Sequence, residues 1–198
     1  MNNDTNYIDH QEIFDYLNKR KGIIDGICIS GGEPTVQKGL IDFIKKIKAI
    51  GIKVKLDTNG SNPKVLEELI DNNLVDYVAM DIKNVFTKYS IITNAKPKIA
   101  DLKESMRLLK NSKIDYEFRT TVVKEFHEYK DLEEIATLIG KSNYYLQKFE
   151  DSDNVLSKGL HSYEDEELLN MFNKLKEKFP NIGIRGIKIE KEKNLCTK

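Results

Sequence analysis

The stretch that decides the fold is Gly26-Ile27-Cys28-Ile29-Ser30-Gly31-Gly32-Glu33-Pro34-Thr35. A short apolar run ends at Ser30, two adjacent glycines follow, and a segment with helical periodicity comes after the proline. Glycine lets the backbone approach a ligand closely, and proline fixes the backbone and donates no hydrogen bond. The stretch therefore predicts a strand end that presents the Glu33 carboxylate and bare peptide groups to a small cationic ligand.

Composition places the chain among single-domain globular proteins. Its 198 residues are enough for a sizeable core, and we expect one domain over 1–198, with its core at about 9–150 and a C-terminal helix and strand at 163–189. Basic and acidic side chains number 32 each, so no field of one sign is available to attract nucleic acid or an anionic membrane. No apolar run approaches the roughly 18 residues of a membrane span. The two cysteines, Cys28 and Cys196, lie far apart, so we expect no structural disulfide and a cytoplasmic location.

Strand-like runs alternate with helical periodicity along the chain. Repeated β-α units of this kind predict an α/β fold, a parallel sheet or barrel with helices outside. We expect helices at about 9–19, 37–50, 63–71, 101–110, 131–139 and 163–179, a loop at 84–98, and strands at about 26–30, 53–58, 76–83, 116–123, 144–149 and 183–189. Gly51 is expected to end the second helix, and Asn62 is expected to cap the start of the third.

The five earlier strands each end in polar side chains. Ligands of parallel α/β folds bind at the carboxyl ends of the strands, so the pattern argues for one shared site. The strand-end residues are Ser30, Asp57-Thr58, Asp81 to Lys83, Arg119 to Thr121, and Gln147.

Two of these strand ends also have purely structural interpretations. Glu33 could merely complement a helix dipole, and a tight turn at the end of the strand fully explains Asn59-Gly60. Asp57 is harder to explain as structural, because a carboxylate that ends an apolar strand needs a partner. A ribose hydroxyl or a cation would serve.

The next strand ends carry charges whose partners stay open. Asp81 and Lys83 face the same way on a strand, so they form a self-contained ion pair or a charged floor for a zwitterionic ligand. Arg119 either pairs with Asp81 or clamps a ligand carboxylate. The residues alone do not separate these alternatives.

Other reactive side chains receive structural interpretations. Cys28 lies between two isoleucines and is expected to be a small core residue. The scattered histidines His10, His127 and His161 are expected at the surface or in caps, not as ligands.

The ordered motifs resemble those of the radical S-adenosylmethionine (SAM) superfamily. More narrowly they resemble the activating enzymes of glycyl-radical enzymes, in the branch that serves anaerobic ribonucleotide reductase. The resemblance covers about 9–149 and rests on Gly31-Gly32-Glu33-Pro34, Asp57-Thr58-Asn59-Gly60, Asp81-Ile82-Lys83, Arg119-Thr120-Thr121 and Leu146-Gln147-Lys148-Phe149.

The resemblance implies roles for the strand-end residues. Gly31, Gly32 and Glu33 would bind the amino group of SAM. The other implied roles belong to residues that line the same pocket (Asp57, Asn59), residues near the SAM carboxylate or the substrate backbone (Lys83, Arg119), and a monovalent-cation site (Asp57, Thr58, Asp81).

The resemblance also implies a reaction and a partner. Such enzymes reduce SAM with a [4Fe-4S] cluster and generate a 5′-deoxyadenosyl radical. The radical takes a hydrogen from a glycine Cα of a partner glycyl-radical enzyme, here one like anaerobic ribonucleotide reductase.

One feature of the family is missing from the sequence. The family holds its cluster with Cys-x3-Cys-x2-Cys, and only Cys28 lies near the expected site, so no iron-sulfur ligands and no catalytic residue are assigned. The expected fold is therefore a partial (β/α)6-type parallel barrel without its first strand and cluster loop.

Three accounts of the chain remain. It is an N-terminally truncated activase, a cluster-less relative that binds SAM or a partner without radical chemistry, or an unrelated α/β module. The reading frame upstream of Met1 would separate the first from the others. Loss of a first strand would leave an open sheet edge near 26–30, and open edges favour self-association.

Overall fold

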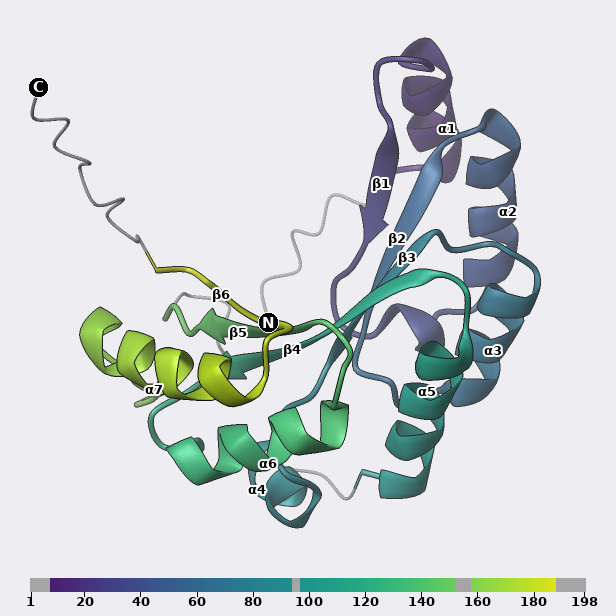
Figure 1. The fold of residues 1–198 in the computed structure, drawn as a ribbon. Coiled ribbons are helices and arrows are strands. Elements are labelled where there is room, and N and C mark those ends of the chain that lie inside the picture. Colours follow the sequence, from purple (N-terminus) through teal and green to yellow (C-terminus); the bar gives the residue numbers. More distant parts are fainter. Residues whose placement is uncertain (1–7, 94–96, 152–157, 188–198) are drawn as a thin grey trace, which may run out of the picture. The chain divides into compact units, whose positions relative to one another are not determined.

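The computed structural model describes residues 8–93, 97–151 and 158–187, whose helices and strands are labelled in Figure 1. The chain divides into two compact units. Unit 1 comprises Met1–Met80 and Lys98–Tyr116, and unit 2 comprises Asp81–Pro97 and Glu117–Lys198. Each unit is described by itself below.

Unit 1 is a parallel α/β layer. The register pairs Cys28 of the first strand with Lys55 of the second, and Lys55 with Tyr77 of the third. The strands are β1 Gly26–Ile29, β2 Lys53–Thr58 and β3 Tyr77–Asp81, whose last residue belongs to unit 2. The helices are α1 His10–Lys19, α2 Leu40–Ile50, α3 Pro63–Asp71 and α5 Ile99–Asn111, and a 3-10 turn, η1, spans Pro34–Val36.

The core of unit 1 lies between one face of its strands and the helices. On β2, Val54 and Leu56 are fully buried, whereas Lys55 between them is not. This is the period of two expected for a strand that is covered on one face. Ile44 and Ile47 of α2 are also fully buried, and α2 contacts β2. The uncovered face of the strands consequently carries the polar side chains.

Unit 2 repeats the arrangement. Its strands are β4 Asp115–Val122, which enters the unit at Glu117, β5 Tyr144–Lys148 and β6 Ile182–Arg185. They run parallel, with Arg119 opposite Tyr145 and Gln147 opposite Arg185. The helices are α4 Tyr89–Thr93, α6 Tyr129–Ile139 and α7 Asp165–Lys178, after a 3-10 turn, η2, at Phe86–Lys88.

The predicted α/β class with parallel strands is confirmed, and most predicted elements are found within a few residues. Gly51 ends α2 in the left-handed region at φ 90°, as expected. The predicted loop at 84–98 instead contains η2 and α4. The last strand was expected to reach 189, but β6 ends at Arg185, and 188–189 and Cys196 lie outside the described residues.

Two local predictions about helix starts are wrong. The helix expected from Gln37 begins at Leu40, because Gly39 has φ 85° and Pro34–Val36 already forms a 3-10 turn. Asn62 was expected to cap α3, but its side chain makes no cap bond and donates to the carbonyl of Thr35 at 2.9 Å. A contact distant in sequence therefore replaces the local cap.

Two expected environments are also wrong. Cys28 is exposed and not a core residue, because it projects from β1 on the opposite face to Ile27 and Ile29. His127 is 1% exposed and not at the surface, whereas His10 and His161 are exposed. Among the described residues, no helix is long and apolar enough to cross a bilayer.

Candidate cofactor-binding site

The Glu33 carboxylate lies at the centre of a hydrogen-bond network in unit 1. Its Oε1 accepts from the Thr35 N–H at 3.2 Å, the Thr35 hydroxyl at 2.5 Å and the Thr58 hydroxyl at 2.7 Å. Its Oε2 accepts from the Asn59 N–H at 2.6 Å. Glu33 thus caps η1 and joins the end of β1 to the end of β2.

This network leaves acceptor capacity on one side of Glu33. A carboxylate offers about four lone-pair positions, and three of the four donors crowd Oε1. Oε2 therefore keeps room for a further donor such as an ammonium group.

The two glycines before Glu33 form an open backbone surface. Gly31 has φ 96° and Gly32 has φ 54°, and both are exposed. A Cβ added at either would meet nothing within 4 Å, so the positions need glycine for their backbone conformation and not for lack of space. Space for a ligand is therefore present beside Glu33.

Asp57 has a partner within its own strand. Lys55 Nζ donates to Asp57 Oδ1 at 2.7 Å, and the Asp57 side chain is only 14% exposed. The same Lys55 Nζ lies 3.9 Å from the Cys28 sulfur. The structural account of Asp57 is therefore an ion pair on the polar face of β2.

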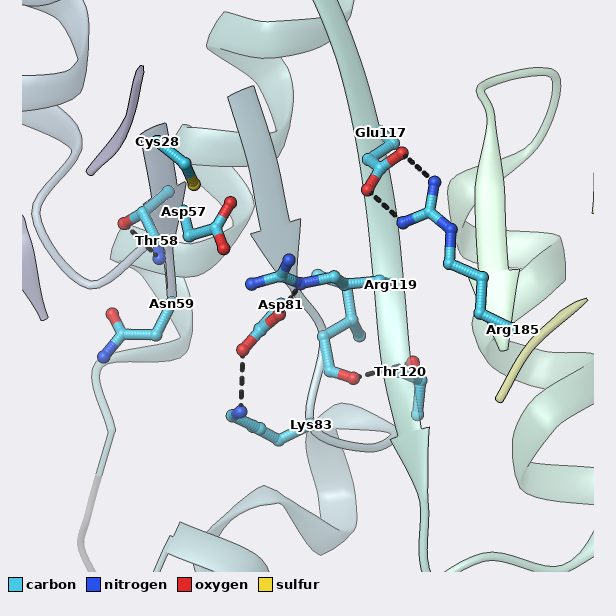
Figure 2. Close-up of polar contacts among 12 residues, drawn as sticks. Cys28, Asp57, Thr58, Asn59, Asp81, Lys83, Glu117, Arg119, Thr120 and Arg185 are labelled. Atoms are coloured by element: carbon cyan, nitrogen blue, oxygen red, sulfur yellow. Dashed lines mark hydrogen bonds and ion pairs between the residues drawn. The ribbon is translucent and has the colours of Figure 1, made fainter. Parts of the chain in front are cut away.

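The charged end of β3 forms a second cluster, in unit 2. Figure 2 shows the Asp81 carboxylate between the side chains of Lys83 and Arg119. Lys83 Nζ donates to Oδ2 at 2.8 Å, and Arg119 Nε donates to Oδ1. The interpretation of Asp81 and Lys83 as an ion pair is confirmed, and so is the pairing of Arg119 with Asp81. Arg119 also has a further interaction.

The main chain of Lys83 is fixed by two residues that the sequence interpretation missed. Its N–H donates to Tyr89 Oη at 3.1 Å, and its carbonyl lies 2.7 Å from His127 Nε2. Burial raises the pKa of Tyr89 to about 12 and lowers the pKa of His127. Both groups are therefore neutral near pH 7, and the apolar residues around Tyr89 in the sequence gave a weak signal of its burial.

A third missed feature is an ion pair between a buried glutamate and a partly exposed arginine, across three strands. Glu117 on β4 is 2% exposed and accepts from both terminal nitrogens of Arg185 on β6, at 2.7 and 2.8 Å (Figure 2). The Arg185 guanidinium lies 3.7 Å from the ring centroid of Tyr145 on β5. No local motif signals this pair, because its members are 68 residues apart.

Comparison with known proteins decides the family. Residues 3–139, more than half of the chain, match the family model described as the radical SAM superfamily. The chain belongs to the radical SAM superfamily. A protein of Methanocaldococcus jannaschii, provisionally named a glycyl-radical enzyme activating enzyme, is 37% identical over 171 residues, which cover 82% of this chain and 71% of the relative.

Solved structures of radical SAM proteins have the same fold. A crystallised domain of pyruvate-formate lyase-activating enzyme from Bacteroides vulgatus gives a TM-score of 0.65 at 19% identity, over 81% of this chain and 99% of that one. Streptococcus suis SuiB bound to S-adenosylmethionine gives 0.69 at 14% identity, over 92% and 45%. At these identities the likeness shows the fold alone, and it agrees with the predicted radical SAM type.

The described residues do not fit the superfamily's iron-sulfur cluster. Such a cluster takes three or four cysteine thiolates, and the 198 residues contain two, of which Cys28 alone is described. No group of three or more His, Cys, Asp or Glu side chains placed to hold a metal occurs in 8–93, 97–151 and 158–187. No chemical step is therefore derived through a cluster.

Proposed function

We propose that this chain is the SAM-binding part of a radical SAM activase that generates a glycyl radical on a partner enzyme. The observation that carries the proposal is the Glu33 network, which holds a carboxylate beside an open diglycine at the ends of two parallel strands. Membership of the superfamily supports SAM as the ligand at that position. The 37% identical relative, with its name, supports the activase assignment.

SAM fits the chemistry of the Glu33 side chain. Its methionine moiety carries an ammonium group, and Glu33 Oε2 can accept a charge-assisted hydrogen bond from it. Gly31 and Gly32 would let that moiety approach the backbone, and Asn59 would line the same pocket. When bound, SAM supplies the sulfonium group that the superfamily cleaves.

The remaining assigned residues belong to the same proposal. Lys83, which follows β3, and Arg119, which lies within β4, would face the SAM carboxylate or the backbone of the substrate protein, since both are cations that gather at Asp81. Asp57, with its neighbour Thr58, and Asp81 would serve the pocket or a monovalent cation. Such an ion would have to compete with Lys55 for Asp57 and with Arg119 for Asp81.

We propose a glycyl-radical enzyme of the anaerobic ribonucleotide reductase kind as the partner, in the cytoplasm. Two distant cysteines are typical of a reducing compartment. We further propose that the cluster ligands come from outside the 198 residues. The second candidate function, a cluster-less SAM-binding relative, is favoured by the same cysteine count.

Calorimetric titration of SAM into the iron-free chain tests the binding site. The wild type should bind, and Glu33→Gln should bind about 10–100-fold more weakly, because a hydrogen bond to a charged group contributes about 1.5–3 kcal/mol. Glu67→Gln, the same change at an exposed position of α3 in the same unit, should bind as the wild type does. Absence of heat from the folded wild type would refute the SAM site.

Two further measurements separate the activase from the cluster-less relative. Reconstitution with iron and sulfide should yield no stable cluster on the 198 residues, and a [4Fe-4S] signal by electron paramagnetic resonance would contradict our assignment of the ligands. The chain should also bind an anaerobic ribonucleotide reductase in sedimentation experiments. SAM binding without any such association would favour the cluster-less relative.

A further inference from the structure

The turn that carries Lys83 is tied to the segment after β4 by two side chains within unit 2. Asn84, which is 1% exposed, donates from Nδ2 to the carbonyl of Phe126 at 2.8 Å. His127 Nε2 lies 2.7 Å from the carbonyl of Lys83. Tyr163, which lies just before α7, donates to the carbonyl of His127 at 2.7 Å, so the main chain of His127 is itself held by a hydrogen bond.

The hydrogen bonds of His127 fix its tautomer. The Lys83 carbonyl lies 2.7 Å from Nε2 and can only accept, so Nε2 carries the proton and donates it. Nδ1 of the neutral ring accepts the backbone N–H of Val123 at 3.1 Å. The Val123 carbonyl also lies 3.3 Å from Nδ1, but it already accepts the backbone N–H groups of Phe126 and His127, at 3.1 and 3.0 Å. A neutral ring with both nitrogens bonded suits a side chain that is 1% exposed.

We propose that His127 is a positioning residue that fixes Lys83, and through it the charged cluster with Asp81, for ligand binding. Lys83 is held at three points: its N–H by Tyr89, its carbonyl by His127 and its Nζ by Asp81. A lysine has four rotatable side-chain bonds, so its ammonium group has a defined place only when the main chain is fixed and Nζ is paired, as it is here with Asp81. The ligand role of Lys83 rests on the function proposed above.

Two substitutions separate the bonds that His127 makes. In His127→Gln the amide nitrogen can take the place of Nε2 and donate to the Lys83 carbonyl. In His127→Asn the shorter side chain can accept from the Val123 N–H but cannot reach Lys83. The Gln variant therefore keeps the hydrogen bond to the Lys83 carbonyl, which the proposal requires. The Asn variant keeps only the hydrogen bond from the Val123 N–H. His161→Asn, at an exposed histidine of the same unit, is the matched control.

Lysine methylation provides a readout that does not depend on SAM. Lysines carrying 13C-methyl groups at Nζ give resolved NMR signals, and Lys83→Arg identifies the signal of Lys83. We expect this signal to stay in place in His127→Gln and His161→Asn, and to move to the position of exposed lysines in His127→Asn. An unmoved Lys83 signal in folded His127→Asn, or equal displacement by both His127 variants, would overturn the proposal.

The wild-type protein gives a test that survives misfolding of the variants. The 15N spectrum of the His127 ring should show the proton on Nε2, and a proton on Nδ1 or on both nitrogens would overturn the proposal. SAM titration then connects the position to function: His127→Asn should weaken binding about tenfold, and His127→Gln much less. Wild type that fails to bind SAM would refute the proposed function, while the two NMR measurements would still decide the role of His127.

Discussion

The pair of Glu117 and Arg185 should make the stability of unit 2 sensitive to loss of one partner, because the Glu117 side chain is buried. We would remove one partner with Arg185→Met, which keeps the apolar length of the side chain and deletes the two hydrogen bonds of 2.7 and 2.8 Å. Glu117 is 2% exposed, so its carboxylate would stay out of water without its main partner. Breaking a buried pair in this way costs about 3–5 kcal/mol.

The exposure of Arg185 places the expected cost at the lower end. The Arg185 side chain is 44% exposed, so water already weakens its attraction to Glu117. We therefore expect a loss of about 3 kcal/mol in the free energy of unfolding.

Urea unfolding followed by circular dichroism measures this loss, and an exposed pair provides the control. Arg107 on α5 also donates two hydrogen bonds to Glu104, from Nε at 2.8 Å and from one terminal nitrogen at 2.6 Å, but the two side chains are 56% and 43% exposed. Arg107→Met should cost less than about 1 kcal/mol. Equal losses in the two single variants would refute the reasoning, because burial would then not decide the cost.

A double substitution tests whether the loss comes from the carboxylate left behind. Glu117→Met with Arg185→Met removes both charges, and replacement of a buried pair by apolar side chains is often neutral. The double variant should thus recover most of the loss. If it is less stable than Arg185→Met, the pair stabilises through its own attraction and not by shielding a buried charge.

Three more outcomes follow from the structure. Gly183→Ala should lower the free energy of unfolding by about 1–3 kcal/mol in urea, since the new Cβ would lie 2.6 Å from the Tyr145 ring. Burial lowers the pKa of His127, whose neighbouring charges are Asp131 and Lys88. As the pH falls, the unfolded chain therefore takes up a proton on this histidine before the folded protein does. The free energy of unfolding should fall below about pH 6.5 in the wild type but not in His127→Gln. Among the described strands β1 pairs only with β2, so it forms an open sheet edge that favours self-association. Light scattering in reductant should therefore show a molar mass that rises with protein concentration. A constant monomer mass would contradict association through that edge.

The sequence predicts best where a local pattern, such as the alternation of a strand or a glycine at a helix end, decides the secondary structure. The alternation of Val54 and Leu56 with polar neighbours identifies β2, and Gly51 identifies the end of α2. Both depend on local physics: the pleat of a strand, and the backbone freedom of glycine. The same local rules recovered the order of strands and helices.

Contacts between distant residues could not be predicted in this way. Glu33 reaches Thr58 and Asn59 across 25 and 26 residues, and the register of β1 against β2 decides which groups it meets. Cys28 was misjudged for a related reason. Its isoleucine neighbours point to the covered face of the strands, and a strand pattern alone does not reveal that Cys28's own face is open.

The Glu33 network also explains how one side chain can be structural and functional together. The donors on Oε1 come from Thr35 and Thr58, and they hold the carboxylate in place before any ligand arrives. When an ammonium group binds Oε2, the Glu33 side chain is therefore already ordered. The free-energy cost of ordering it belongs to folding and does not reduce the affinity for the ligand. The bonds that support a purely structural reading of Glu33 are thus the ones that would make it an effective ligand group. Substitution of Glu33 should change both stability and affinity, and only a variant that loosens Thr58 while keeping the carboxylate separates the two.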